Sequence, residues 1–301
     1  MKKGIFFFFF LFLLVTLKPA TAQINLPPSQ SLGIGTSYAH YNGSINFVEG
    51  YLVASDSTHI NHKLGFTAET WFLPSVASQS GTLISKSTGT QNEFSLDFES
   101  RFDQTSKKYS IQYQFSAADL SLGCAMRTVT YQQQMSQNQF VQWNHVAGVI
   151  DGRGNMYLFI NGKKATTPLT ILGMPCVANN DITIGGRKLN DTTVDNYIKG
   201  FMDDLRISST ARYSTDFAPP TGPFIPDANT QILYHFDNIV TDTSGNNHTG
   251  IQYGTVFFVL VQVSSITPTP SATLRASPTP SSATRPTPTP GRGGWSLSPF
   301  R

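Results

Sequence analysis

Residues 143–164 read WNHVAGVIDGRGNMYLFINGKK and contain the clearest secondary-structure pattern of the chain. Over 143–150 and again over 156–160, the side chains divide into two alternating sets, one at every second position, and a repeat of two residues is the period of a β-strand. Between the two runs, residues 151–154 (DGRG) tolerate positive φ, and Asn161-Gly162 supplies a second tight turn. The segment therefore predicts an antiparallel β-hairpin with His145 in its first strand.

Similar short runs, separated by Gly, Asn, Ser or Pro, recur along most of the chain. The clearest is 109–116 (YSIQYQFS), where apolar and polar side chains alternate as in a sheet that is packed on one face and wet on the other. The absence of helical periodicity predicts an all-β fold, a two-sheet antiparallel sandwich or a jelly roll. The predicted strands are 45–53, 67–73, 82–86, 93–101, 109–116, 126–131, 141–150, 156–160, 181–185, 198–207, 231–236 and 250–263.

The two ends of the chain differ from this pattern. Two lysines, an apolar run over 5–15 and the small residues Ala20-Thr21-Ala22 predict a signal peptide over 1–22, too short to span a bilayer. Residues 265–301 are rich in Pro, Thr and Ser, which predicts a disordered, low-complexity tail. We therefore expect one folded domain over 23–264 in a secreted or cell-surface protein that does not span the membrane once the signal is removed.

The charge of the chain argues against nucleic acid as a partner. The whole chain has 21 Lys and Arg against 18 Asp and Glu. Seven of the basic residues lie in the two ends, which contain no acid, so 14 basic and 18 acidic residues remain in 23–264. A mildly acidic domain does not offer the basic stripe that nucleic acids require.

Cys124 and Cys176 are the two cysteines of the chain. In an exported protein an even pair more often forms a disulfide than two buried free thiols. We therefore expect a Cys124–Cys176 bridge. It would close a long loop and contribute roughly 4 kcal/mol in the chain-entropy model.

Five motifs in a fixed order resemble the laminin-G-like jelly-roll domains of the concanavalin A-like lectin/glucanase superfamily. The most specific of them lies at 200–213, where a strand that contains an aromatic residue, two adjacent acids and an Arg-Ile pair is followed by a Ser/Thr-Ala-Arg-Tyr turn. The resemblance covers roughly 38–236 and implies the jelly-roll fold. The motifs are FTAETWFLP (66–74), GTLISKS (81–87), WNHVAGVIDGRGNMYLFINGK (143–163), ITIGGR (182–187) and GFMDDLRISSTARY (200–213).

Residues 229–250 (NTQILYHFDNIVTDTSGNNHTG) have two interpretations. They are similar to the N-terminal part of many such domains, which has an apolar strand followed by an Asp-x-Ser-Gly-Asn turn. In this chain, however, they follow the Asp-Asp-Leu-Arg motif. They are either the closing strand of this domain or the beginning of a truncated second copy. We favour the closing strand, because a further apolar run follows at 255–263.

Two segments were considered for catalysis. His145 would need a partner from another strand, and in the family its motif is a structural strand, so we expect a half-buried His satisfied by the sheet. Hydrolases of this superfamily carry acids on one strand in the pattern Glu-x-Asp-x-(x)-Glu. Here Ser95 precedes Asp97 and Glu99 where the first carboxylate is required, and Glu93 lies two residues too early, so we expect no enzymatic activity.

A calcium site is the one metal site that the resemblance supports. Asp203, Asp204 and Asp242 are acids beside predicted turns, and Ca²⁺ prefers oxygen ligands in such loops. Alternation places Asp203 with Leu205 and Ile207 on the core face, where a carboxylate is costly without a partner or an ion. We therefore propose Asp203 and Asp242 as possible Ca²⁺ ligands. No Cys/His cluster for zinc is present.

Together these patterns favour a non-catalytic recognition module that binds carbohydrate or an extracellular protein, with a glycan or a protein as partner. A structural spacer domain is the alternative, and a glycoside hydrolase of the same fold is a third. Aromatic residues that could stack on a sugar cannot be selected from the sequence, because most aromatic side chains occupy alternating core positions.

Overall fold

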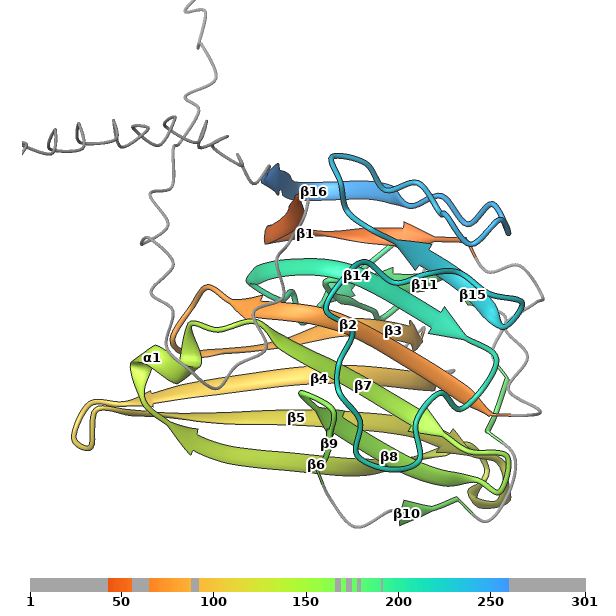
Figure 1. Cartoon of the computed structure of the whole chain (residues 1–301), viewed down its shortest axis with the longest axis horizontal. Coiled ribbons are helices and arrows are strands. Elements are labelled where there is room, and N and C mark those ends of the chain that lie inside the picture. Colours follow the sequence, from red (N-terminus) through yellow and green to blue (C-terminus); the bar gives the residue numbers. More distant parts are fainter. Residues whose placement is uncertain are drawn as a thin grey trace, which may run out of the picture. The chain divides into compact units, whose positions relative to one another are not determined.

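A computed structural model of the chain describes residues 43–55, 65–87, 92–165, 169–171, 175–177, 180–190 and 192–259 (Figure 1). The predicted signal peptide (1–22) and tail (265–301) lie outside these residues, so both stay predictions, as do the boundaries of the domain. Within the described residues, no helix is long and apolar enough to cross a membrane.

The described part of the chain is almost entirely β-structure. Its two helices are a single turn each, η1 (Leu120–Leu122) and α1 (Gln137–Phe140). The long strands are β1 (Ser44–Ala54), β2 (Phe66–Pro74), β3 (Gln79–Ser87), β4 (Asn92–Asp103), β5 (Lys108–Asp119), β6 (Ala125–Met135), β7 (Asn144–Ile150), β8 (Asn155–Ile160), β14 (Gly200–Ser208), β15 (Thr230–Tyr234) and β16 (Ile251–Val259). The short strands are β9 (Lys163–Lys164), β10 (Leu169–Thr170), β11 (Ile182–Ile184), β12 (Arg187–Lys188) and β13 (Val194–Asp195).

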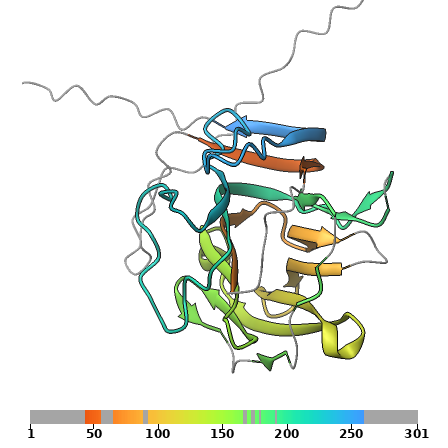
Figure 2. The ribbon, with the colours of Figure 1, turned by 90° about the vertical axis from the view of Figure 1, so that its right-hand side faces the viewer.

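Fourteen of the described strands form one curled antiparallel sheet in the order β10-β8-β7-β2-β14-β1-β11-β3-β4-β5-β6, with β15 added to β14, β16 to β1 and β9 to β8. The remaining two, β12 and β13, pair in a separate two-stranded sheet. The sheet folds over at β1, which pairs with β14 near its start and with β11 near its end. One layer therefore contains β2, β7, β8 and β14, and the other contains β3, β4, β5 and β6 (Figures 1 and 2). The predicted jelly-roll sandwich is confirmed.

The hydrophobic core lies between these two layers. The Phe66 ring on β2 contacts those of Phe94 on β4 and Phe115 on β5, with ring centroids 4.5 and 6.5 Å apart. Gly148 on β7 lies opposite Phe115, and a Cβ atom there would come within 2.3 Å of its ring. A side chain at this position would therefore push the layers apart, and the core is close-packed around it.

The predicted hairpin is present, with two local differences. Strand β7 pairs with β8 from Val146↔Ile160 to Ile150↔Met156. The turn uses Gly154 at φ 79°, whereas Asp151 acts through its carboxylate, which accepts hydrogen bonds from the backbone N–H of Arg153 and Asn155 at 2.9 Å each. The strand predicted over 141–150 begins only at Asn144, because α1 and its C-cap occupy the preceding residues.

The segment after the Asp-Asp-Leu-Arg motif belongs to this domain. β15 pairs with β14 from Leu205↔Tyr234 to Ser208↔Thr230. β16 then pairs with β1 from Ser44↔Val259 to Val53↔Ile251. The interpretation of 229–250 as the closing part of the domain is therefore confirmed, and the alternative of a truncated repeat does not fit this pairing.

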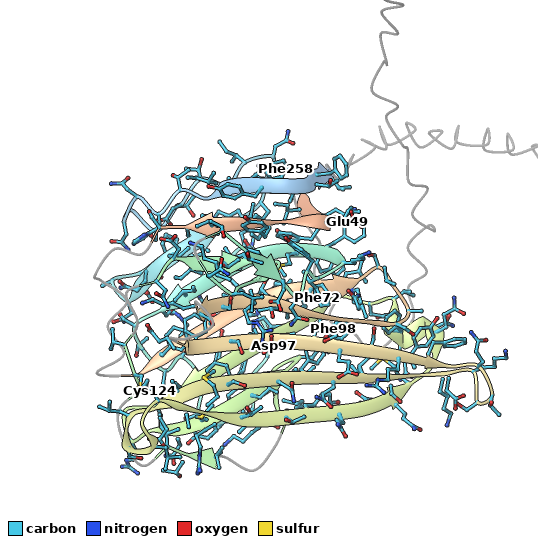
Figure 3. All side chains as sticks on the ribbon, turned by 180° about the vertical axis from the view of Figure 1, so that it is seen from behind. Glu49, Phe72, Asp97, Phe98, Cys124 and Phe258 are labelled. Atoms are coloured by element: carbon cyan, nitrogen blue, oxygen red, sulfur yellow. A yellow bond between two sulfur atoms is a disulfide. The ribbon has the colours of Figure 1, made fainter. Side chains whose placement is uncertain are left out.

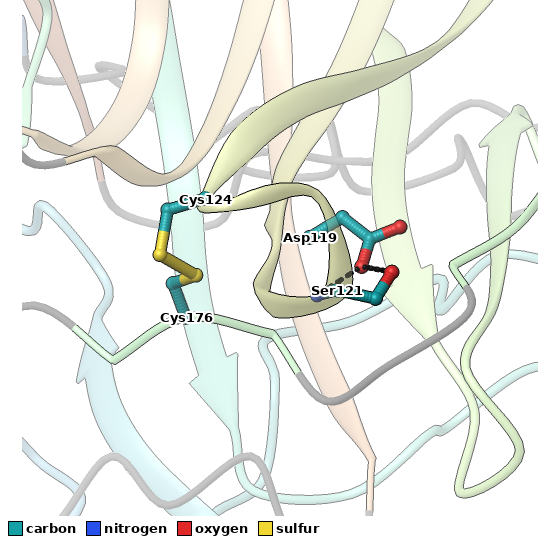
Figure 4. The surroundings of a disulfide bond; sticks show 4 residues. All are labelled: Asp119, Ser121, Cys124 and Cys176. Atoms are coloured by element: carbon teal, nitrogen blue, oxygen red, sulfur yellow. Dashed lines mark hydrogen bonds between the residues drawn. A yellow bond between two sulfur atoms is a disulfide. The ribbon is translucent and has the colours of Figure 1, made fainter.

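The predicted disulfide is also present (Figure 4). Cys124 and Cys176 are bonded with their Cα atoms 5.7 Å apart, across 52 residues of sequence. The bridge ties the turn between β5 and β6 to the segment that follows β10. The same turn is held by Asp119, whose carboxylate accepts hydrogen bonds from the N–H of Ser121 at 2.9 Å and from its hydroxyl at 2.6 Å.

Candidate functional site

The two layers differ in what lies over their outer surfaces. Residues 209–228 cross the outer face of the β2, β7, β8 and β14 layer (Figure 1). Tyr213 and Phe217 from this segment stack on each other with ring centroids 3.6 Å apart, and both pack against Phe159 of β8. Farther along, Phe224 packs with Trp71 of β2 and Leu233 of β15. We call this surface the covered face, since its side chains are shielded from solvent.

A hydrogen-bonded charge network is buried beneath this cover. Glu69 on β2 is fully buried, and its Oε2 lies 3.0 Å from Nε2 of His145 and accepts a hydrogen bond from the hydroxyl of Tyr213 at 2.8 Å. Its Oε1 accepts from Nε of Arg206 at 2.8 Å. Burial alone would raise the pKa of Glu69, but the hydrogen bond from His145 and the charge of Arg206 outweigh it and lower the pKa.

This network shows the surroundings of His145. The side chain is fully buried, not half-buried as expected from the sequence, and its partner is a carboxylate on a neighbouring strand. His145 and Glu69 both have zero exposed side-chain area, so neither reaches a substrate. The sequence signal that was missed is Glu69 in FTAETWFLP: it lies two residues before Trp71, which pairs directly with His145.

The outer surface of the other layer carries polar side chains and is not covered in this way (Figure 3). Because cross-strand partners share a face, the register of β4, β5 and β6 places three rows of polar side chains side by side. Most of them are exposed or half-buried. We call this surface the open face. Its rows are Ser95–Ser116–Thr128, Asp97–Gln114–Thr130 and Glu99–Gln112–Gln132.

The rows of the open face are themselves hydrogen-bonded. The Gln132 amide nitrogen donates to Oε1 of Gln112 on the neighbouring strand. The hydroxyls of Ser116 and Thr128 lie 2.8 Å apart. Amides and hydroxyls that already form cross-strand bonds are held in place, and each retains further donor or acceptor capacity for a ligand.

Asp97 lies at the centre of the open face and is held on both sides. Its Oδ1 accepts a hydrogen bond from the hydroxyl of Thr82 at 2.6 Å, and its Oδ2 accepts one from the hydroxyl of Ser95 at 2.6 Å. The Asn196 amide donates in turn to Thr82 Oγ1 at 2.9 Å. Burial raises the pKa of Asp97, although the bonds from Ser95 and Thr82 partly oppose it.

The other acids of this strand are also engaged. Glu99 accepts a hydrogen bond from Nε of Arg101 at 2.6 Å. Glu93 is buried and pairs with Lys86 at 2.9 Å, so it does not stand on the open surface with Asp97 and Glu99. The carboxylate of Glu93 is therefore shielded from a ligand on this surface.

The two proposed calcium ligands occupy different surroundings. Asp242 is enclosed by its own loop: Oδ1 accepts from the N–H of Leu233 and Ser244, and Oδ2 accepts from the hydroxyl of Ser244 and the N–H of His248. The carboxyl of Asp203 lies near the charges of Asp204 and Asp237, which raise its pKa, and near that of His235, which lowers it. The described residues contain no group of three or more His, Cys, Asp or Glu side chains placed to hold a metal ion. Calcium binding stays a prediction.

The prediction that Asp203 shares a face with Leu205 and Ile207 is wrong. Asp203 pairs with Trp71 on β2, and the register then shifts so that Leu205 pairs with Thr70. Asp204, at φ 42°, is the extra residue of this β-bulge. Asp203 therefore lies on the covered face, although it is buried as expected. Burial and the charge of Asp204 raise its pKa to about 8.

Comparison with known proteins identifies the family of the chain. The family model Laminin_G_3, described as the concanavalin A-like lectin/glucanases superfamily, matches residues 42–216. No curated protein sequence matches the chain significantly.

Solved structures with a similar fold come from several sources. A putative carbohydrate binding protein from Bacteroides ovatus aligns with TM-score 0.55 and 15% identity, over 73% of this chain and 60% of that one. A native heptameric SAP-like pentraxin from Limulus polyphemus aligns with TM-score 0.49 and 14% identity, over 76% of this chain and 99% of that one. The chain thus spans 60% of the length of the Bacteroides protein. At 15% identity, the likeness to the Bacteroides protein shows the fold alone.

Proposed function

Since this chain belongs to the concanavalin A-like lectin/glucanase superfamily, we propose that it is a secreted, non-catalytic recognition module that binds carbohydrate through its open face. The observation that carries the proposal is the contrast between the two outer surfaces. One is sealed by residues 209–228, whereas the other presents rows of hydroxyl, amide and carboxylate groups to solvent.

The chemistry of the open face suits a polyhydroxylated ligand. Glutamine amides both donate and accept, and Ser and Thr hydroxyls do the same, so they match sugar hydroxyls that also have both roles. Neighbouring members of a row lie on strands about 4.8 Å apart, which presents these groups at regular intervals. A polar surface of this kind offers an extended glycan several simultaneous hydrogen bonds, each of modest strength.

The function does not depend on catalysis. A retaining glycosidase needs two carboxylates that flank the scissile bond, one as acid and one as nucleophile. Burial raises the pKa of Asp97 in the direction that suits a proton donor, but the hydroxyl of Ser95 takes the place of the first acid and bonds to Asp97 instead. We therefore assign Asp97 to binding and to the order of the surface.

The experiment that tests the proposal is a screen of the chain without residues 1–22 against immobilised glycans and matrix proteins, with Ca²⁺ and with EDTA. Saturable binding to glycans supports the proposal, and its loss in EDTA adds a metal to the site. Saturable binding to proteins alone moves the function to protein recognition. Absence of saturable binding in both conditions favours the structural spacer, and release of reducing sugar favours a hydrolase.

A further inference from the structure

Three tyrosines from distant parts of the chain form a cluster on the surface. Tyr51 is on β1, Tyr197 follows β13, and Tyr253 is on β16. The rings of Tyr51 and Tyr253 are stacked with centroids 5.0 Å apart and an interplanar angle of 11°. The ring of Tyr197 lies 6.0 Å from that of Tyr51, tilted by 37°. We call these three residues the tyrosine cluster.

The tyrosine cluster lies on the same side of the layer as the open face. Val53 on β1 is linked through the register to Thr183, then Ser85 and then Ser95, so all four side chains share one side. Tyr51 is two residues from Val53 along β1 and therefore points the same way. The side chains of Ser85 and Thr183 that lie between them are buried, so the tyrosines and the polar rows are two separate exposed parts of this side.

The exposure of these rings distinguishes them from the packing aromatics. Tyr197 retains 36% and Tyr253 retains 43% of its accessible surface, whereas most other aromatic side chains of the described residues are buried in the core or under the cover. Burial and the neighbouring hydroxyls of Tyr197 and Tyr253 raise the pKa of Tyr51. Its hydroxyl therefore stays neutral at physiological pH, and the cluster offers aromatic surface with hydrogen-bonding edges.

The charged groups beside the cluster are already paired. Lys188 of the β12–β13 hairpin lies close enough to Tyr51 for its charge to act on the pKa of that tyrosine. Lys188 Nζ contacts Asp181 at 2.8 Å, and Arg187 contacts Asp195 at 3.0 Å. These two cations and two anions cancel, so the rim provides donors and acceptors without net charge. An anionic ligand would have to compete with Asp181 and Asp195 for the cations.

We propose that the tyrosine cluster is a subsite for a neutral hexopyranose, whose C–H face stacks on the ring of Tyr253 while its hydroxyls bond to the rim. The proposal rests on the proposed function and specifies its ligand class. The negative face of an aromatic ring attracts the weakly positive C–H groups of a sugar. The balanced rim selects neutral sugars over carboxylated or sulfated ones, as does the excess of acids over bases in 23–264.

The test is a titration of the full secreted chain and its variants with neutral hexose oligosaccharides and with their carboxylated and sulfated counterparts. Tyr253→Ala and Tyr197→Ala should each raise the Kd for the neutral ligand on the order of 10-fold, the equivalent of one aromatic contact. Tyr253→Phe should bind like the wild type because it keeps the ring. Phe257→Ala is the matched control, since Phe257 is an exposed aromatic on the same strand that forms no ring contact with the cluster.

The outcomes distinguish failure of the subsite proposal from failure of the proposed carbohydrate-binding function. Absence of glycan binding by the wild type overturns both. Binding that is unchanged in both tyrosine-to-alanine variants but lost when Gln132 is replaced overturns only the subsite. Tighter binding of the anionic sugars overturns the neutral ligand class. Concentration-dependent dimers that Tyr253→Ala dissociates, in a wild type that binds no sugar, would assign the cluster to contact between two copies of the chain.

Discussion

The hydroxyl of Ser95 donates a hydrogen bond to Oδ2 of Asp97 at 2.6 Å, along the same strand of the open face. Thr82 occupies the other carboxylate oxygen at the same distance. Ser95 thus holds the carboxylate of Asp97 in place, at the position where we expect a hydrolase of this fold to carry its first acid. We therefore expect this surface to bind glycans without the pair of acids that cleaves a glycosidic bond.

We expect no glycan hydrolysis by the purified chain. Asp97→Ala and Glu99→Ala should leave the release of reducing sugar at the background of a mock preparation, while Asp97→Ala weakens glycan binding. The reducing-sugar assay on a panel of glucans measures the first and a binding titration measures the second. Hydrolysis that both variants abolish would show that Asp97 and Glu99 are catalytic.

The buried network at Glu69 should be a main source of stability for the covered face. Glu69→Gln leaves Arg206 and His145 without their carboxylate, and removal of one partner from a buried ion pair costs roughly 3–5 kcal/mol. Glu99→Gln is the control, because Glu99 pairs only with the exposed Arg101. Urea unfolding at pH 7 measures both, and equal losses for the two variants would contradict a structural role for the network.

The lowered pKa of Glu69 predicts that the stability of the folded chain depends on pH. The pKa of Glu69 is lower in the folded chain than the ordinary value of 4.5. Its contribution is therefore present above that value and is lost as the pH falls below it through the folded pKa. Thermal unfolding from pH 7 down to pH 3 should show a steeper loss of Tm in the wild type than in Glu69→Gln. Parallel curves would mean that other groups cause the acid sensitivity.

Reduction of the Cys124–Cys176 bridge should destabilise the domain without changing its fold. A closed loop of 52 residues corresponds to about 4 kcal/mol in the chain-entropy model. Denaturant unfolding with and without dithiothreitol measures the difference. The double variant Cys124→Ser, Cys176→Ser should match the reduced wild type and should not respond to dithiothreitol.

Asp203 provides a test of the calcium prediction. Burial and the charge of Asp204 raise its folded pKa from the ordinary value of 3.8 to about 8, so in metal-free protein its stabilising contribution is fully present below pH 3.8 and is lost progressively until the pH has risen through 8. In EDTA, Asp203→Asn should therefore have a higher Tm than the wild type at pH 9 and a similar Tm at about pH 3.5. Calcium bound by Asp203 would favour the ionised form, so added Ca²⁺ would reverse that order at pH 9.

The parts of the structure that follow local rules could be predicted from the sequence. The alternation in 109–116 and the turns after 150 and 160 depend only on neighbouring residues, and the hairpin formed as expected. The family motifs likewise supplied the jelly roll, because they record which strands pair. The strand predicted over 141–150 was begun too early, because α1 ends at Phe140 with Val141 as its C-cap, and Gln139 supports that turn by accepting a hydrogen bond from the N–H of Ser136.

The features that depend on distant pairing could not be predicted. The bulge at Asp204 moves Asp203 from one face to the other, and a one-residue shift of this kind leaves no mark in the alternation of side chains. The tyrosine cluster brings together residues 51, 197 and 253, and only the pairing of β1 with β16 shows that two of them stack. Glu69 was missed for the same reason, since its partners His145 and Arg206 come from other strands.

The most direct test of carbohydrate recognition by the open face compares two neighbouring glutamines of β6. Gln132 pairs with Gln112 on the open face, whereas Gln133 pairs with Ile111, whose side chain is in the core. Both glutamines are exposed, so replacement by alanine should affect folding little in either case. A glycan titration should show weaker binding by Gln132→Ala and unchanged binding by Gln133→Ala. Equal affinities for the wild type and both variants would contradict the account, because the ligand would then bind elsewhere.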